Sequence, residues 1–560
     1  MEQLFVGVDV GTTSARAGVF DANGRLLGTA RHPIAVWHEP GDIVEQSSAD
    51  IWHACAAAVR GALTEAAVLP ASVGGVGFDA TCSLVALDPA GGPLTVSASG
   101  DRARNVIVWM DHRAIAEADK ITATGDPVLR HVGGVISPEM EPPKLLWLKR
   151  HVSDTWRRAG HFLDLADFLT FRATGATVRS MCTLTCKWTY LAHERRWSRG
   201  FFDSIGLGDL LADGGHRIGL DIAEPGTALG QGLTEESAAA LGLAPGTAVG
   251  AALIDAHAGG LGSIGGLDAD DAPADVTERL AYIMGTSACI MATTDTPRFV
   301  PGVWGPYFSA MVPGLWLNEG GQSAAGAGID HLVRSHPAYD EASRLAKAAG
   351  MDLLDFLERH ALARFADIGS AASLARELHV LPEFLGNRSP YADPNARAVI
   401  SGLDLDADLA SLARLFVAGL CGLAYGLADV VDTMRSHDIT CRMMVISGGA
   451  ARSRLVRQIM ADTTGLSVAL PQSPEPVLLG AAMLGAVAAG THRTLRDAMA
   501  SMTRLGATTA ATAPGMARFH AAKRRVYGLM RKLDQEGRLA MRALEHGPLK
   551  AAEADLAACC

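Results

Sequence analysis

The chain has little that would direct it to nucleic acid, to a membrane or to an export route. Among its 560 residues, 49 are Lys or Arg and 60 are Asp or Glu, and no polybasic block occurs. With a formal charge of −11, neither nucleic acid nor an anionic membrane surface is expected as a partner. The start, MEQLF, has no basic segment before an apolar run, so no secretory signal is expected. The most apolar stretch, PVLLGAAMLGAVAAG near residue 480, is too short for a membrane span and predicts a buried helix.

Cysteine is sparse and irregularly spaced. An odd number of scattered thiols in a long chain is typical of a reducing compartment, so we expect a cytoplasmic protein. Cys182 and Cys186 could share a metal ion, but no second Cys/His pair follows at zinc-site spacing. Burial as small apolar side chains is therefore the expectation for both. The full set is Cys55, Cys82, Cys182, Cys186, Cys289, Cys421, Cys441, Cys559 and Cys560.

The two common phosphate-binding loops are also missing near the N-terminus. The dipeptide Gly-Lys occurs nowhere, which excludes a Walker A loop, and the first turn is not GxGxxG. That turn, Gly11-Thr12-Thr13-Ser14, lies between predicted strands at 5–10 and 15–20, and a third strand follows at 25–30. A dinucleotide oxidoreductase is disfavoured, because its loop leads from a strand into a helix. The backbone amides and hydroxyls of this turn could instead hold phosphate oxygens.

The same pattern returns about half a chain later. LAYIMGTSACIMAT predicts a strand, the turn Gly285-Thr286-Ser287 and a second strand. Gly-Thr dipeptides are common enough to recur by chance, but the matching strand context favours two similar lobes, each with a phosphate-facing turn.

Helices and strands alternate around both hairpins, so we expect an α/β protein. We divide it into an N-terminal domain (1–265), an acidic, turn-rich connector (266–279), a C-terminal domain (280–540) with a helical insertion (331–380), and a tail (541–560). In the first domain, Ser48 is expected to cap a helix, and Asp111 to cap the helix after a strand at 106–110.

Two aspartates stand out because their neighbours are apolar. Asp9, one step before the first turn, either hydrogen-bonds that turn or lies by a magnesium ion beside a triphosphate. Asp255, in GAALIDAHAGGLG, either caps the following helix or acts as a general base, since a carboxylate in apolar surroundings has a raised pKa. His257 is expected to be a core histidine rather than a catalyst.

In combination, the motifs of this chain resemble those of the FGGY family of carbohydrate kinases, within the actin-like ATPase superfamily, and most closely its ribulose kinase branch. The resemblance spans roughly residues 4–500, with one departure, EMEPP before Lys144. The motifs are GVDVGTTSARAGVFD, GFDATCSLVALD, VWMDHRA, KLLWLKRH, FLDLADFLTFRATG, CKWTY, IDAHAGG, GTSACIM, NEGGQSAAG, FLGNRSPYADPNARA and ISGGAARS.

The resemblance implies two RNase-H-like domains with ATP and Mg²⁺ in the cleft between them. It makes Asp255 the base and places Asp9 and Asp255 beside the metal. Lys187 and Glu319 would contact sugar hydroxyls, although on their own they would be taken as solvated charges. Ala80 and Thr81 would line the same pocket. The nucleotide-binding residues it implies are Gly11, Thr12, Thr13, Gly285, Thr286, Gly326, Gly449, Ala450 and Ser453.

The resemblance thus predicts ATP-dependent phosphorylation of a small-molecule sugar, ribulose to ribulose 5-phosphate. Two alternatives stay open: a kinase for another polyol or ketose (ribitol, xylulose or glycerol), and a non-catalytic ATP-binding sensor or chaperone of the same superfamily. A sensor needs no base, so Asp255 favours the kinases. A homodimer is one open assembly state.

Overall fold

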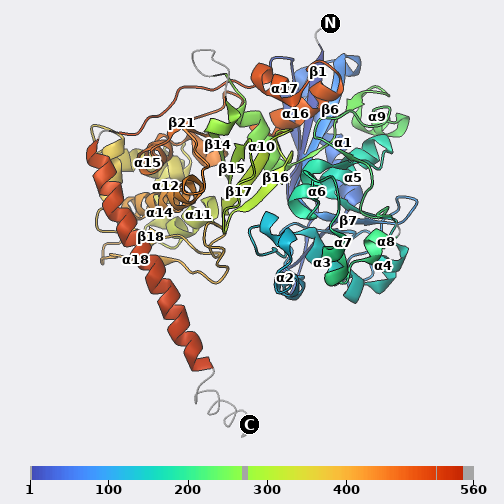
Figure 1. Cartoon of the computed structure of the whole chain (residues 1–560). Helices are drawn as coiled ribbons and strands as arrows, with labels where there is room; N and C mark the ends of the chain where they lie inside the picture. Colours follow the sequence, from blue (N-terminus) through green and yellow to red (C-terminus); the bar gives the residue numbers. More distant parts are fainter. Residues whose placement is uncertain (1–2, 213, 268–274, 513, 546–560) are drawn as a thin grey trace.

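The computed structural model describes residues 3–212, 214–267, 275–512 and 514–545. Figure 1 shows two lobes side by side, each with a sheet at its centre and helices outside. Half of the predicted connector (268–274) and most of the predicted tail, with Cys559 and Cys560, lie outside the described residues.

The central sheet of the first lobe begins with the predicted meander. β1 pairs antiparallel with β2, β2 with β3, and β1 pairs parallel with β6. The order is β3-β2-β1-β6-β12, with β13 also on β6. The strands are β1 (Leu4–Val10), β2 (Ser14–Phe20), β3 (Leu26–Pro33), β6 (Val73–Ala80), β12 (Ala248–Val249) and β13 (Leu253–Ile254).

The central sheet of the second lobe repeats this plan. Its first two strands form an antiparallel hairpin, and the first also pairs parallel with a later strand, as β1 does with β6. The repeat expected from the two Gly-Thr turns is therefore a repeat of the sheet. The order is β16 (Trp304–Phe308), β17 (Trp316–Gln322), β15 (Ala288–Thr294), β14 (Arg279–Met284), β20 (Met443–Ser447) and β21 (Ser467–Ala469).

Two helices are exchanged between the lobes. α10 (Asp255–Ile264) follows the first sheet in sequence but packs on β14 and β20, whereas α16 (Pro476–Ala488) packs on β1 and β6. The approach of α16 requires glycine in the strands, because a Cβ at Gly7 would lie 1.9 Å from the Leu478 carbonyl oxygen. The apolar stretch near residue 480 is thus a buried helix, as predicted, and it joins the lobes.

The opposite face of each sheet carries other helices. α1 (Ser48–Ala66) covers β2 and β3 of the first sheet, while α14 (Leu409–Arg435) and α15 (Arg454–Thr464) contribute to one apolar core with β14 and β20. Further helices are α2 (Ile115–Thr122), α3 (Glu141–His151), α4 (Ser153–Arg158), α5 (Leu165–Thr174), α6 (Met181–Lys187), α7 (Arg199–Ser204), α8 (Asp209–Ala212), α9 (Glu235–Leu241), α11 (Gly326–Arg334), α12 (Tyr339–Ala348), α13 (Leu353–Leu362), α14 (Leu409–Arg435), α15 (Arg454–Thr464), α17 (Leu495–Met502) and α18 (Pro514–Glu545).

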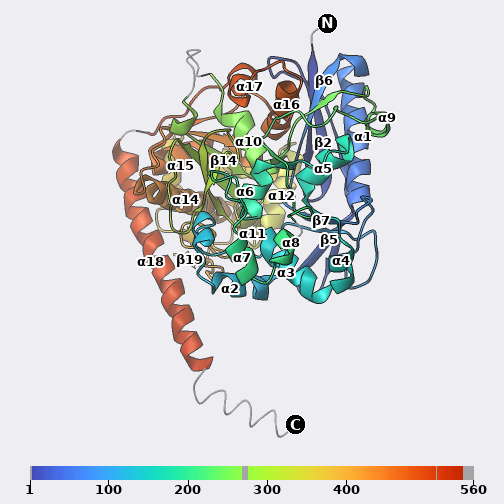
Figure 2. The same cartoon turned by 45° about the vertical axis from the view of Figure 1, so that its right-hand side comes forward.

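Within the described residues, one helix is long and apolar enough to cross a membrane. This is α14, and 89% of its most apolar window is buried inside the protein. It is the central helix of the second lobe. α18 runs along the outside of that lobe and extends beyond it in both views (Figures 1 and 2).

Two details of the first lobe differ from expectation. The side chain of Ser47, rather than Ser48, caps α1 by accepting a hydrogen bond from Asp50 N. Asp111 caps no helix, since α2 begins at Ile115 after Ala114. The strand expected at 106–110 is limited to β8 (Val106–Ile107).

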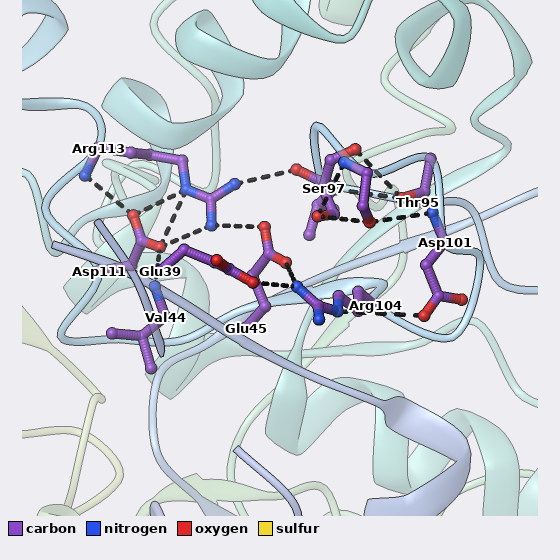
Figure 3. Close-up of polar contacts among 11 residues, drawn as sticks. Glu39, Val44, Glu45, Thr95, Ser97, Asp101, Arg104, Asp111 and Arg113 are labelled. Atoms are coloured by element: carbon purple, nitrogen blue, oxygen red, sulfur yellow. Dashed lines mark hydrogen bonds and ion pairs between the residues drawn. The ribbon is translucent and has the colours of Figure 1, made fainter. Parts of the chain in front are cut away.

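Asp111 instead belongs to a buried ion-pair network shown in Figure 3. The Arg113 guanidinium donates to Asp111 Oδ2 at 2.7 Å and to Glu45 Oε1 at 2.9 Å, and Val44 N donates to Asp111 Oδ2. This network anchors the VWMDHRA segment to the second sheet of the first lobe. That sheet runs β4 (Trp37–Glu39), β5 (Ile43–Gln46), β8, β7 (Leu84–Leu87) and β9 (His161–Asp164).

Candidate active site

A cavity of about 460 Å³ lies between the lobes, and both Gly-Thr turns face it. The turns have similar closures: Gly11 N donates to Ser14 O at 3.1 Å, and Gly285 N donates to Ser287 O at 2.9 Å. Trp109 pins the first turn, because its indole Nε1 donates to Thr12 Oγ1 at 3.0 Å. Backbone amides and hydroxyls from both lobes thus line one space, as a bound polyphosphate requires.

Three aspartates gather where neighbouring parallel strands end. Asp9 of β1 is in register with Asp79 of β6, and Asp255 directly follows β13, which pairs with β6. Asp9 and Asp255 line the cavity, whereas Asp79 is completely buried behind them. Burial, together with the nearby Asp9 carboxylate, raises the pKa of Asp79 well above its usual range.

This group has the donor chemistry for magnesium. Carboxylate oxygens are the ligands that Mg²⁺ prefers, usually one or two of them with water and phosphate. Both carboxylate oxygens of Asp79 are buried and have no hydrogen-bond partner in the described part of the chain. Asp9 is paired with Arg16, whose Nε lies 2.7 Å from Asp9 Oδ2 and whose Nη1 lies 3.0 Å from Glu475 Oε2. The residues therefore fit a metal-bound phosphate beside Asp9.

Asp255 is the first residue of α10 and not its cap: the N-cap position is Ile254, and no side chain caps this helix, so the helix-cap alternative is wrong. Asp255 Oδ1 accepts a hydrogen bond from Ala256 N at 2.7 Å. Burial, with help from Asp9, raises the pKa of Asp255 to about 6, although the Ala256 amide acts in the opposite direction. A carboxylate with this pKa is ionised at neutral pH and is basic enough to accept a hydroxyl proton.

Charged side chains of both signs line the deeper end of the cavity. Lys187, at the end of α6, lies 4.5 Å from the Trp304 ring, and the Arg388 guanidinium lies at the same distance from that ring. Arg388 also pairs with Glu139 across the lobes at 3.0 Å. Burial opposes ionisation of Glu319, but His257 and Lys187 lower its pKa to about 2. Glu319 is thus buried and paired with His257, and Lys187 is buried against the Trp304 ring, so neither side chain is solvated.

His257 is a buried histidine, as expected, but it links two functional regions. Its Nε2 lies 3.2 Å from Glu319 Oε2, and its Nδ1 lies 3.0 Å from Cys182 Sγ. Cys182 and Cys186 are buried, also as expected. The fold nevertheless brings a third side chain of metal-ligand type, His257, next to both thiols, which sequence spacing did not reveal.

The other expected residues lie around this cavity. Thr81 lines it, and Ala80 is buried beside it, paired with Ile254. Gly326 N donates to Gly285 O at 3.0 Å, which puts it against the second turn.

The expected adenosine segment starts next to that turn. A Cβ on Gly448 would lie 2.2 Å from the Met284 carbonyl oxygen, whereas Gly449 faces open space. Ala450 lies in the same short helix, η5 (Gly449–Arg452). Ser453 has a structural task, because its hydroxyl caps α15 by accepting from Val456 N at 3.0 Å.

Several cavity residues were missed by the sequence analysis. Asp79 lies in the motif GFDATCSLVALD and Trp109 in VWMDHRA. The signal for Asp79 was a charged residue within a predicted apolar strand. The pairing of residues far apart in sequence had no signal at all. Of the missed residues, Arg16, Trp109, Glu139 and Arg388 line the cavity, while Asp79 is buried behind Asp9 and Trp304 contacts Lys187 and Arg388.

Comparison with known proteins assigns the fold to a family. Residues 4–262 match the N-terminal domain, and residues 280–489 the C-terminal domain, of the FGGY family of carbohydrate kinases. The chain belongs to this family. It is an ATP-dependent carbohydrate kinase with the two-domain, actin-like ATPase fold.

Individual relatives agree with this assignment. A human FGGY carbohydrate kinase domain-containing protein is 47% identical over 512 residues, covering 90% of this chain and 92% of the relative. A D-ribulokinase of Saccharomyces cerevisiae is 36% identical over 539 residues, covering 90% and 75%. The crystal structure of xylulose kinase from Rhodospirillum rubrum aligns with a TM-score of 0.75 and 22% identity, covering 94% of this chain and 98% of that one, and shows the fold alone.

Proposed function

We propose that this FGGY kinase transfers the γ-phosphoryl group of ATP to the terminal hydroxyl, O5, of ribulose. The observation that carries the proposal is the position of Asp255, a half-buried carboxylate that lines the cavity together with the phosphate-facing turns, Lys187 and Glu319. The similarity to a D-ribulokinase supports ribulose as the acceptor.

The proposed chemistry follows from this placement. Asp255 accepts the proton of O5 as that oxygen attacks the γ-phosphorus in line. Phosphoryl transfer has a loose transition state, so positioning and charge stabilisation supply most of the rate enhancement. Lys187 and Glu319 orient the sugar hydroxyls, while Ala80 and Thr81 shape the wall beside them.

We assign the phosphates to Gly11, Thr12, Thr13, Gly285 and Thr286, whose amides and hydroxyls line the cavity. Asp9 and Asp255 would hold Mg²⁺, which when bound neutralises charge on the phosphates. The adenosine would lie against a second group, placed beside the Gly285 turn: Gly326, Gly449, Ala450 and Ser453.

The enzyme works in the cytoplasm, with domains 1–265 and 280–540 closing on the sugar. All described cysteines are unpaired, which suits a reducing compartment. Two alternatives compete with this proposal: ribitol, xylulose or glycerol as the acceptor, and a non-catalytic ATP sensor. The assay below distinguishes them. A measurement of the mass in solution would reveal a homodimer.

The test is ADP release with saturating Mg-ATP against D-ribulose, L-ribulose, D-xylulose, ribitol and glycerol, with a no-sugar control. We expect a strong preference for one ribulose, and a loss of roughly 10²–10⁴ in rate for Asp255→Asn. Asp154→Asn, at an exposed position, is the matched control and should keep full activity. Equal ADP release without sugar, or activity on none of these sugars, would overturn the ribulose proposal.

A further inference from the structure

Helices α6 and α10 bring together three side chains that can ligate a metal ion. Cys182 and Cys186 are four residues apart on α6, so their thiols lie on one helix face. His257 comes from α10 and presents Nδ1 to both, 3.0 Å from Cys182 Sγ and 4.0 Å from Cys186 Sγ. The three ligand atoms all lie within 4.8 Å of one another.

These separations suit tetrahedral zinc. Zn–S bonds of about 2.3 Å and Zn–N bonds of about 2.0 Å, at a tetrahedral angle, place sulfur and nitrogen about 3.5 Å apart. The two observed sulfur–nitrogen distances bracket this value, so small side-chain rotations would make both bonds.

The far side of the histidine ring provides an independent observation. His257 Nε2 lies 3.2 Å from Glu319 Oε2. A metal-binding histidine usually donates its second ring N–H to a carboxylate, which fixes the tautomer and turns the other nitrogen's lone pair toward the metal. Glu319 therefore sets His257 in the orientation that a metal at Nδ1 requires.

Charge and donor type select the ion. Cys182, Cys186 and His257 are fully buried, and a buried site disfavours net charge. Two thiolates and Zn²⁺ sum to zero, and thiolate donors favour zinc over the magnesium proposed for the cleft. We propose that Cys182, Cys186 and His257 bind one structural zinc ion, distinct from the phosphate-binding region.

The described residues supply three ligands, so the fourth zinc ligand would be a water molecule. The Tyr307 hydroxyl is buried and has no hydrogen-bond partner within the described ranges. It belongs to β16, which packs against α6, so it is available to hydrogen-bond such a water.

The ion would join two elements that end in cleft residues. α6 ends at Lys187, and α10 begins at Asp255, so zinc between them fixes the spacing of these helices. Because a site with buried ligands forms together with the fold, zinc binding would contribute to folding stability.

The test measures the metal content of the full chain in the absence of ATP and sugar. The zinc proposal can therefore be judged even if the ribulose proposal fails. The protein is produced with added zinc and purified with a non-thiol reductant and without a chelator. The number of zinc ions per chain is then measured by inductively coupled plasma mass spectrometry. We expect one zinc per chain, lost in Cys182→Ser and in Cys186→Ser but retained in Cys55→Ser, a buried helix cysteine away from the site.

A second measurement does not depend on the variants folding. Wild-type chain produced with cobalt in place of zinc should show the intense visible bands of a tetrahedral site and a thiolate-to-cobalt charge-transfer band. Folded wild-type protein that holds no zinc after supplementation, or cobalt bound without the charge-transfer band, would overturn the proposal. The cluster would then be a hydrogen-bonded Cys182–His257–Glu319 chain.

Discussion

At the scale of single residues, the buried charges of the first lobe are held by few partners. Arg113 is 2% exposed, and it neutralises Asp111 and Glu45, which are buried to the same degree. Its guanidinium also stacks 4.8 Å from the Trp147 ring. The same segment supplies Trp109, which hydrogen-bonds Thr12, so this network supports the phosphate-facing turn from behind.

Arg113→Met should therefore destabilise the protein strongly. It leaves the buried Asp111 carboxylate without its cation and Glu45 with only Arg104, 3.6 Å away. Removing one member of a buried ion pair costs about 3–5 kcal/mol. Urea unfolding should show this loss. Arg157→Met, which breaks an exposed pair with Asp154, should change the free energy of unfolding by less than about 1 kcal/mol.

The charge explanation has its own control. If unpaired carboxylates cause the loss, adding Asp111→Asn and Glu45→Gln to Arg113→Met should recover part of it. No recovery would mean that the loss comes from the packing of Arg113 against Trp147.

At the scale of elements, α18 depends on a buried neutral histidine. His520 packs against α14, where its Nδ1 lies 3.0 Å from the Tyr425 hydroxyl. Lys523, one turn later, donates to the Leu378 carbonyl oxygen at 2.8 Å. Burial lowers the pKa of His520 to about 4, while Asp462 raises and Lys523 further lowers it.

This shift predicts a loss of stability in mild acid. The unfolded chain binds the proton near pH 6.5, whereas the folded chain binds it only near pH 4, so stability falls as pH decreases between these values. From pH 7 to pH 5, the His520 contribution is roughly 2 kcal/mol. Between pH 7 and pH 5, the free energy of unfolding of His520→Gln, measured with urea, should therefore fall by about 2 kcal/mol less than that of the wild type. Replacement of the exposed His38 by Gln should leave the pH dependence unchanged, and an unchanged dependence in His520→Gln would refute the assignment.

Elements also show how far the sequence could predict this protein. Both Gly-Thr hairpins follow from local signals, namely alternating strands around a glycine turn, and Asp255 was recognised because a charge in an apolar stretch is locally unusual. The partners of these residues were not predictable in this way. Arg388 with Glu139 and His257 with Cys182 are joined by tertiary packing, which leaves no periodic pattern in the sequence.

At the scale of the whole molecule, the lobes share helices and also contact across the cleft. α10 and α16 each pack on the sheet of the opposite half, close to one another, so they form the connection about which the lobes would move. At the deep end, the ion pair of Arg388 with Glu139 crosses between the lobes, and His257 of the exchanged helix α10 contacts Glu319 of β17. A sugar bound there would contact both lobes at once.

We therefore predict that sugar and nucleotide together close the cleft. Closure would exclude water from the phosphoryl group and limit ATP hydrolysis. Small-angle scattering of the chain with a non-hydrolysable ATP analogue and Mg²⁺ should show a smaller radius of gyration once ribulose is added. Lys187→Met removes a proposed sugar contact while leaving the phosphate-facing turns intact, so it should show no further compaction at the same ribulose concentration. Unchanged scattering of the wild-type chain with both ligands bound would mean that the lobes are already held together by their cross-cleft ion pairs.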